Sequence, residues 1–454
     1  MEFPALSKNN IYAIPSGDFW GEVPERIYML YAPLNGQISL ATQQLAEEIE
    51  KRASGEINDD ALLQMLNTFK AKGMVPVHYL PKTPHDLYQV DLLVNYTCNF
   101  KCTYCYSAAG RSSMQVNFAQ IKAVIDYLFC SSREQINPYI INFSGGGEPL
   151  LSFPLIKQTV EYIEKVTEGK DYKYNVGLVT NGSLITPEII EYFKLKKIDM
   201  AVSFEILERF QNMERGNYDK VAANIDMMLD MDYPFGIRTT FTPDSVLYMC
   251  EMIEELAQRF PRLKSVVFDT VLSPDIFKTP DMLSTYYDNF IEEYYKAKQR
   301  GKELGIKVES IAVETLSMVR DRTCEGKIVL TPMGTISCCA RVSSPKETLY
   351  DKYIYGAVED GELHFDEGNF RQIMSENNIY SQDFCHDCFA KWNCGGGCRL
   401  FHHSFSPEFL EVKCKFTKQG LKQQIFNVLS DNFRRTKGQD LFTFIDEKIK
   451  AGEI

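Results

Sequence analysis

Two adjoining stretches decide the fold, LYQVDLLV at residues 87–94 and CNFKCTYC at residues 98–105. The first is apolar and rich in β-formers, which predicts a buried strand. Three thiolates on the loop that follows can hold three irons of a cubane cluster and leave the fourth without a protein ligand. Electron-transfer clusters normally have four cysteine ligands, so the loop predicts an iron reserved for a cofactor or substrate. Zinc is the alternative, but residues 106–129 contain neither Cys nor His.

Strand, loop and helix patterns alternate downstream of this loop. The expected strands are residues 87–94, 139–143, 174–180, 200–204, 236–240 and 263–270. Amphipathic helices are expected near residues 116–130, 153–167, 187–197, 217–231, 244–260 and 281–304. Apolar strands that alternate with helices indicate a parallel sheet covered by helices. Six such units predict an α/β fold, a partial (β/α)6 TIM-like barrel with its chemistry at the C-terminal ends of the strands.

The spacing Cys98-x3-Cys102-x2-Cys105, with the aromatic Tyr104 before the last cysteine, resembles the signature of the radical S-adenosylmethionine superfamily. The resemblance implies that these cysteines hold a catalytic [4Fe-4S] cluster whose open iron binds the amino and carboxylate groups of S-adenosylmethionine. It also implies the chemistry: one electron cleaves the sulfonium, and the resulting 5′-deoxyadenosyl radical abstracts hydrogen from the substrate.

The loop after the second strand resembles the Gly-Gly-Glu-Pro motif with which this superfamily binds the methionine amino group. It contains Gly145, Gly146, Gly147, Glu148 and Pro149. Glycines let the backbone approach a ligand closely, and the glutamate can accept a hydrogen bond from an ammonium group.

Further cofactor contacts are implied after the third and fourth strands. Thr180 and Asn181 follow the third strand, while Ser203 and Glu205 stand where the superfamily often places side chains near the ribose. Arg215 occupies about the position of an arginine that pairs with the methionine carboxylate, with a solvated charge at a helix start as the alternative. Arg238, on the fifth strand, is either a ligand contact or half of a structural salt bridge.

The chain becomes rich in Cys and Gly from about residue 320. The spacings are Cys324-x9-Gly334-x4-Cys339 and Cys385-x2-Cys388-x5-Cys394-x3-Cys398, with Cys414 alone after them. This order resembles the seven-cysteine SPASM pattern of radical enzymes that modify peptides and proteins. It implies two auxiliary iron–sulfur clusters of the [4Fe-4S] type. The distal set would be Cys385, Cys388, Cys394 and Cys414, and the nearer set Cys324, Cys339 and Cys398.

The nearer set has three members because Met318 stands where some relatives carry a further cysteine. An open iron site, a substrate thiolate, a [2Fe-2S] cluster and recruitment of Cys338 all remain open from the sequence. Cys130 and Cys250 fall in expected helices and are interpreted as buried structural cysteines. The neighbouring His386, His402, His403 and Trp392 are interpreted as structural residues rather than ligands.

The N-terminal segment reads as a small separate unit. Residues 26–32 and 37–40 predict a strand, a turn and a strand, and helices follow at residues 43–53 and from Asp59, with a linker at residues 75–86. The unit resembles the winged-helix-like α+β domain that binds leader peptides at a sheet edge in ribosomal peptide biosynthesis. A structural cap on the barrel is the alternative.

The expected domains are residues 1–84 for peptide recognition, 85–310 for the radical barrel, 311–420 for the SPASM domain and 421–454 for a helical end. The net charge of −12 speaks against non-specific nucleic-acid binding. We expect no membrane partner and a cytoplasmic location, since no signal peptide or apolar span is visible. Thirteen cysteines without an export signal indicate metal binding rather than disulfides.

These patterns predict a maturase that acts on a ribosomally made precursor peptide, leader plus core. It would install a thioether or carbon–carbon crosslink, using S-adenosylmethionine and a ferredoxin- or flavodoxin-type electron donor. Auxiliary clusters suit this reaction, because forming a crosslink from a substrate radical requires removal of one more electron. The alternatives are a formylglycine-forming sulfatase maturase, a radical enzyme acting on a small molecule, and a non-catalytic zinc-binding module.

Overall fold

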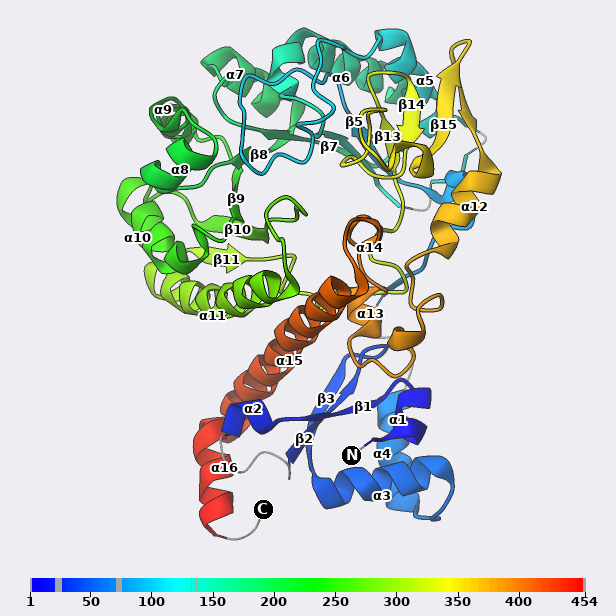
Figure 1. Ribbon diagram of the computed structural model, residues 1–454, viewed down its shortest axis with the longest axis vertical. Coiled ribbons are helices and arrows are strands. Elements are labelled where there is room, and N and C mark those ends of the chain that lie inside the picture. The colour runs from blue at the N-terminus through cyan, green and yellow to red at the C-terminus, as the bar shows by residue number, and fades with distance from the viewer. Residues whose placement is uncertain (1, 21–26, 71–75, 132, 136, 452–454) are drawn as a thin grey trace.

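A computed structural model describes residues 2–20, 27–70, 76–131, 133–135 and 137–451. A large curved sheet with outer helices forms the upper part of Figure 1, and a small sheet with its own helices forms the lower part. Helix α15 (Pro407–Lys437) runs from one part to the other. No helix in the described ranges combines the length and apolarity needed to cross a membrane.

Seven parallel strands make up most of the large sheet, in the spatial order β5 to β11. They are β5 (Gln89–Leu92), β6 (Tyr139–Phe143), β7 (Tyr174–Thr180), β8 (Asp199–Ser203), β9 (Gly236–Phe241), β10 (Ser265–Thr270) and β11 (Lys307–Glu309). The helices that follow them are α5 (Phe118–Leu128), α6 (Phe153–Thr167), α7 (Pro187–Lys196), α8 (Glu208–Glu214), α9 (Tyr218–Asp230), α10 (Met249–Arg259) and α11 (Pro280–Leu304). This mostly parallel α/β sheet confirms the predicted class.

The six predicted β/α units are present, and the sheet contains further strands beyond them. The predicted bounds 139–143 and 174–180 are those of β6 and β7. The sixth strand begins at Ser265 rather than residue 263, and the helix expected from residue 244 begins at Met249 after a 3-10 turn. The sequence analysis missed β11, because three residues are too few to show an alternating pattern.

The Cys-rich segment extends this sheet instead of forming one of its own. Strand β13 (Ile328–Leu330) pairs in parallel with β5, next to the first cysteine loop. Strands β14 (Thr335–Ser337), β15 (Ile354–Glu359) and β16 (Glu362–Phe365) then add antiparallel pairs. The short helices α12 (Glu367–Ser375), α13 (Lys391–Cys394) and α14 (Arg399–Ser404) lead to α15. The first cysteine loop and the later cysteines therefore share one framework.

The lower part contains an antiparallel sheet of β1 (Tyr12–Pro15), β2 (Ile27–Ala32) and β3 (Gln37–Thr42). The helices are α1 (Pro4–Lys8), α2 (Gly17–Trp20), α3 (Gln43–Ser54) and α4 (Asp60–Lys70). The two predicted strands and two predicted helices are confirmed, whereas β1, α1 and α2 were not predicted. Residues 26 and 75, at the ends of a predicted strand and the predicted linker, lie outside the described residues.

The expected linker is tied to the rest of the chain. Its residues Val77–His78 form β4, which pairs in parallel with β12 (Val319–Arg320), just before the nearer cysteine set. The Nδ1 atom of His78 also lies 3.5 Å from the carboxylate of Glu325. The N-terminal unit is therefore attached beside Cys324 as well as through the covalent chain.

Helix α15 joins the two parts of the molecule. Cys414 lies inside this helix, whereas the sequence analysis placed the helical end after it, and the expected boundary at residues 420 and 421 falls in its interior. The second half of α15 and α16 (Leu441–Lys450) share a buried core with the small sheet. Members of this core are Tyr12, Ile27, Met29, Tyr31, Leu421, Ile425, Phe426, Leu441 and Ile445. The C-terminal helices therefore belong to the core of the N-terminal unit.

Replacing Ile425 with Ala tests this shared core. The side chain is fully buried, and removing it should destabilise the N-terminal sheet by about 2–5 kcal/mol. Hydrogen exchange of the amides of β2 should accelerate, while β6 and β7 in the large sheet keep their protection. Asp431→Ala, on an exposed face of the same helix, is the matched control. Equal exchange in both variants would contradict the shared core.

Candidate active site

A cavity of about 1470 Å³ lies where the C-terminal ends of the parallel strands face the Cys-rich segment and α15. Eleven of the thirteen cysteines line it: Cys98, Cys102, Cys105, Cys324, Cys338, Cys339, Cys385, Cys388, Cys394, Cys398 and Cys414. Ile14 and Pro15 of β1 also line it. The cavity thus reaches from the first cysteine loop to the small N-terminal sheet.

The first cysteine loop follows β5 directly. Burial raises the pKa of the Cys98 thiol and that of the Cys102 thiol, and each also feels the charges of the other cysteines of the loop. Cys98, Cys102 and Cys105 are therefore close enough to interact electrostatically. A bound metal has to displace the thiol protons, because only thiolates are ligands.

The glycine loop packs against the backbone that leads into the first cysteine loop. The Gly147 N–H donates to the Asn95 carbonyl at 2.9 Å, and the Glu148 N–H donates to the Thr97 carbonyl at 2.8 Å. A β-carbon on Gly147 would lie 1.9 Å from the Thr97 carbonyl oxygen, and one on Gly146 would lie 2.5 Å from that of Asn95. Side chains at these two positions would force the loops apart.

Glu148 links three loops of the site. Its carboxylate accepts hydrogen bonds from the Thr180 hydroxyl at 2.6 Å, the Asn181 N–H at 2.8 Å and the Leu150 N–H at 3.1 Å. Burial raises the pKa of this carboxyl group. All three donors favour the ionised form and so oppose the effect of burial. Pro149, the next residue, is buried and begins a 3-10 turn.

Arg215 belongs to the cavity wall, so the alternative of a solvated charge at a helix start is wrong. Its side chain is 9% exposed, and its Nη1 donates to the Tyr104 hydroxyl at 2.8 Å. Within the described residues, its buried Nε has no hydrogen-bond partner. The guanidinium also interacts electrostatically with Cys102. An unpaired buried donor beside a cysteine set suits an anionic ligand group.

Glu205 has a different environment from the one the sequence suggested. It is fully buried and is absent from the cavity lining, while Ser203 does line the cavity. Its carboxylate accepts from the Tyr104 hydroxyl and from the Thr240 N–H, the latter at 3.0 Å, and lies 3.7 Å from Arg215. Burial raises its pKa to about 7. Glu205 thus positions Tyr104 and Arg215, and the ribose contact stays a prediction.

The later cysteines fall into two groups. Cys385 interacts electrostatically with Cys388, Cys394 and Cys414, and burial raises its pKa to about 12. Cys339 interacts in the same way with Cys324 and Cys398, and burial likewise raises its pKa to about 12. Among the described residues, no three His, Cys, Asp or Glu side chains lie close enough to coordinate a single ion.

Comparisons with known proteins bear on this site. Residues 92–257 match the family model described as the Radical SAM superfamily. That range contains the first cysteine loop, the glycine loop and Arg215. The chain carries a radical SAM domain. It is therefore a radical SAM enzyme, and this domain implies a [4Fe-4S] cluster with S-adenosylmethionine.

Two curated relatives of this radical SAM enzyme extend beyond the domain. The radical SAM cyclopropyl synthase TigE of Paramaledivibacter caminithermalis is 22% identical over 347 residues, 70% of this chain and 69% of that protein. A cysteine-type anaerobic sulfatase-maturating enzyme of Clostridium perfringens is 20% identical over 336 residues, 69% of this chain and 89% of that protein.

Two solved structures share the fold. The structure of anSMEcpe with bound AdoMet and Cp18Cys peptide has a TM-score of 0.57 at 17% identity and covers 78% of this chain and 99% of its own. Streptococcus suis SuiB bound to its precursor peptide SuiA has a TM-score of 0.50 at 14% identity, with 88% and 98% covered. At these identities the likeness shows the fold alone.

Four further residues of this radical SAM enzyme were singled out from its sequence, and the structure gives the surroundings of each. Arg238 forms an ion pair with Asp269, and both line the cavity. Cys130 lies just after α5 and is exposed, so its interpretation as a buried cysteine is wrong, while Cys250 is half-buried in α10. Trp392 is largely buried, and its indole N–H donates to the Asn10 side chain at 2.8 Å.

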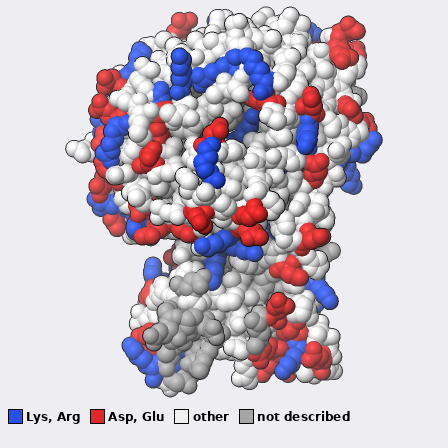
Figure 2. Space-filling view, viewed as in Figure 1, with Lys and Arg blue, Asp and Glu red and all other residues white. Residues whose placement is uncertain are grey.

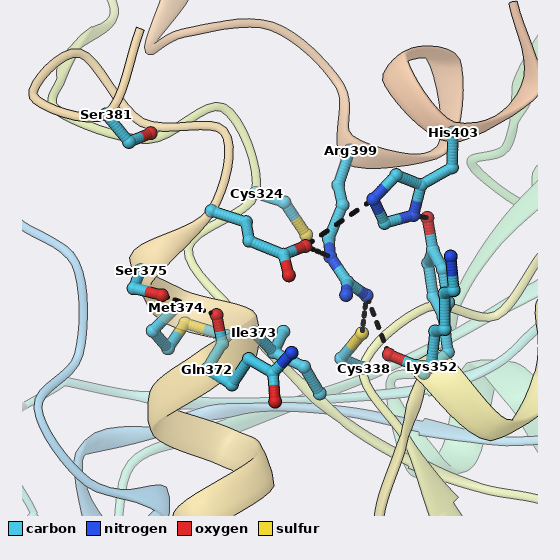
Figure 3. A network of polar contacts seen from close by, with 12 residues as sticks. Cys324, Cys338, Lys352, Gln372, Ile373, Met374, Ser375, Ser381, Arg399 and His403 are labelled. Carbon is cyan, nitrogen blue, oxygen red and sulfur yellow. Dashed lines mark hydrogen bonds and ion pairs between the residues drawn. The ribbon is translucent and has the colours of Figure 1, made fainter.

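The buried Cys338 lies beside a fixed cation. Figure 3 shows the Arg399 guanidinium beside Cys338; its Nη1 is 3.9 Å from the Cys338 sulfur and donates to the Lys352 carbonyl at 2.9 Å. Its Nε donates to the Glu376 carboxylate at 2.8 Å, and His403 Nε2 lies 3.5 Å from the same group. Of the other histidines, His402 contacts the Gly396 carbonyl and His386 pairs with Asp387.

Basic side chains gather round the cavity although the chain carries a net charge of −12. Figure 2 shows Lys and Arg side chains at the waist of the molecule, over α15.

The buried Asp91 of β5 is a residue of the site that was not predicted from the sequence. Its carboxylate lies 2.9 Å from Lys327 in the cavity wall. An acidic residue inside an otherwise apolar strand could have revealed it.

Cys102→Ala should abolish production of 5′-deoxyadenosine from S-adenosylmethionine. The variant loses one of three thiolates that the loop offers to the cluster. Chromatography of anaerobic reactions measures the product directly. Cys130→Ala, at the exposed cysteine away from the cavity, is the matched control and should retain full production. Undiminished cleavage by Cys102→Ala would refute the assignment of this loop.

Arg215→Met should weaken S-adenosylmethionine binding by about tenfold or more, because a charge-assisted hydrogen bond in a buried site contributes about 1.5–3 kcal/mol. Equilibrium dialysis with the reconstituted enzyme gives the dissociation constant. Arg209→Met removes an exposed arginine that pairs with Glu251, and it should bind like the unmodified chain. A dissociation constant that moved equally in both variants would contradict a specific role for Arg215.

Proposed function

We propose that this radical SAM enzyme is a maturase that installs a thioether or carbon–carbon crosslink in a ribosomally made precursor peptide. The observation that carries the proposal is the cavity, since one space is lined by all three cysteine sets and by β1 of the N-terminal unit. A peptide held at that unit would have continuous access to the first cysteine loop. The relative TigE, a radical SAM cyclopropyl synthase, and the fold shared with SuiB, whose structure contains a bound precursor peptide, support this proposal.

The chain's own residues fit the proposed cofactors. Cys98, Cys102 and Cys105 would hold the first cluster, and the unpaired Nε of Arg215 would meet the carboxylate of S-adenosylmethionine. The distal and nearer cysteine sets would hold two auxiliary clusters. When bound, the first cluster and S-adenosylmethionine would supply a hydrogen-abstracting radical, and the auxiliary clusters an acceptor for the second electron.

Leader recognition is proposed for the N-terminal sheet. Within the described residues, β1 and β3 each pair with β2 alone, so each has one edge without a strand partner. A leader peptide could add there as a further strand. The β1 edge lies at the cavity, because Ile14 and Pro15 are part of its lining. A leader at β1 would place the following core peptide in the cavity.

The deciding experiment incubates a candidate precursor peptide, encoded by a short reading frame beside this gene, with the reconstituted enzyme, S-adenosylmethionine and a reductant. Crosslinking should lower the peptide mass by two hydrogens per event, and fragmentation should locate the bond. Production of 5′-deoxyadenosine with an unchanged peptide mass would contradict crosslinking of that peptide. Repetition in heavy water would then detect epimerisation.

Leader dependence is best tested by shortening the peptide rather than the enzyme. Deleting residues 1–80 would expose the apolar side chains of Leu421, Ile425 and Phe426, which share the core of the N-terminal sheet. A core peptide without its leader should bind at least tenfold more weakly and react more slowly than the full precursor. Equal binding and rate for both peptides would remove the leader-binding role.

Formylglycine formation is the second candidate, because the chain covers 89% of a sulfatase-maturating relative. Met318, at the place of an additional auxiliary cysteine, counts against it. A sulfatase-derived peptide containing a target cysteine separates the two functions. Conversion of that cysteine to formylglycine would favour the second candidate, whereas an unchanged peptide alongside a crosslinked precursor would favour the first.

A further inference from the structure

Two basic residues line the cavity together with the distal and nearer cysteine sets. Arg320, the last residue of β12, interacts electrostatically with Cys394 of the distal set and Cys324 of the nearer set. Lys413, next to Cys414 on α15, interacts with Cys394 and Cys414 of the distal set and with Cys398 of the nearer set. Both side chains line the cavity. Each therefore faces cysteines from both sets.

Lys413 is held in this place without a carboxylate. Its ammonium lies 4.7 Å from the ring centre of Tyr287 and 4.4 Å from that of Phe416. No Asp or Glu in the described part of the chain forms an ion pair with it. Tyr287 is fully buried and itself interacts with Cys398. Aromatic faces attract a cation without neutralising it, whereas burial lowers the pKa of this ammonium to about 8.

The Arg320 guanidinium likewise has a hydrogen-bond donor without a partner. Its Nη1 donates to the Thr323 carbonyl at 3.1 Å. Its Nε is buried and has no hydrogen-bond partner among the described residues. A buried unpaired N–H is costly unless a ligand satisfies it. Arg320, which lines the cavity with Cys394 and Cys324, thus offers an unpaired donor as well as a positive charge.

We propose that Arg320 and Lys413 raise the reduction potentials of the two auxiliary clusters and so favour acceptance of an electron there. The inference rests on the proposed function, which assigns those clusters to the two cysteine sets. A cluster held by thiolates becomes more negative on reduction, and nearby positive charge stabilises the reduced form. Net charge and hydrogen bonds to sulfur are recognised determinants of cluster potential. Cations facing both sets would act on both potentials together.

The test is a redox titration followed by electron paramagnetic resonance. Replacing Cys98, Cys102 and Cys105 with Ala removes the first cluster and leaves the auxiliary signals unobscured. In this background, Lys413→Met and Arg320→Met should each shift the ratio of oxidised to reduced auxiliary cluster by about tenfold or more. That corresponds to a fall of 59 mV in a one-electron potential. Lys413→Arg, which keeps the charge, should titrate close to its parent.

Lys415→Met is the matched control. Lys415 lies two residues along the same helix, lines the same cavity and lies 3.6 Å from the carboxylate of Asp288. Its loss should leave the auxiliary potentials unchanged. If Lys413→Met lost iron, Lys413→Gln, which keeps a polar group without the charge, would be titrated in its place. Unchanged potentials in iron-loaded Lys413 and Arg320 variants would overturn the inference.

Iron and sulfide analysis separates this inference from the proposed function. Three four-iron clusters would give about 12 irons in the unmodified chain and about 8 in the variant without the first cluster. Iron for a single cluster in the unmodified chain would overturn the auxiliary clusters and the inference together. A full complement of iron with unshifted potentials would overturn only the role of Arg320 and Lys413.

Discussion

The close approach of two backbones, without intervening side chains, holds the first site together. The glycine loop donates through Gly147 and Glu148 to the carbonyls of Asn95 and Thr97, just before the first cysteine. Glu148 then binds the loop after β7 through Thr180 and Asn181. Three successive strand ends are connected by these few hydrogen bonds. A change that separated the first pair would disturb the cysteine loop and the cofactor-facing residues together.

Arg215 is also held in place by buried polar groups. Tyr104 and Glu205 hold one side of its guanidinium, and its buried Nε has no hydrogen-bond partner among the described residues. Such pre-positioning reduces the entropy lost when a ligand binds. The local charge around the cavity is positive although the whole chain is acidic, so net charge alone was a poor guide to the chemistry of the site.

Periodicity predicted the parallel sheet because strands such as β6 and β7 are buried and bounded by clear helix patterns. It failed for β1 and β11, which have four and three residues. The division of the later cysteines into Cys385, Cys388, Cys394 and Cys414 on one side and Cys324, Cys339 and Cys398 on the other came from the resemblance to the SPASM pattern and stays a prediction, since spacing alone does not divide the run from Cys385 to Cys398. Spacing also could not reveal that Glu205 turns toward Tyr104 and Arg215, because it places a residue at a strand end without fixing its partners.

Sequence patterns also missed the continuity of α15, since the predicted helical end began only after Cys414. Gly420, inside this helix, allows close packing, because a β-carbon there would lie 3.3 Å from the Val313 carbonyl oxygen. The helix of 31 residues carries Cys414 near one end and the apolar partners of the N-terminal sheet near the other. For construction of chimeric enzymes, the N-terminal unit and the second half of α15 would have to be exchanged together. Inserting one residue between Cys414 and Leu421 would rotate the two ends of α15 by about 100° relative to each other. An exchanged N-terminal unit would then face away from the cavity.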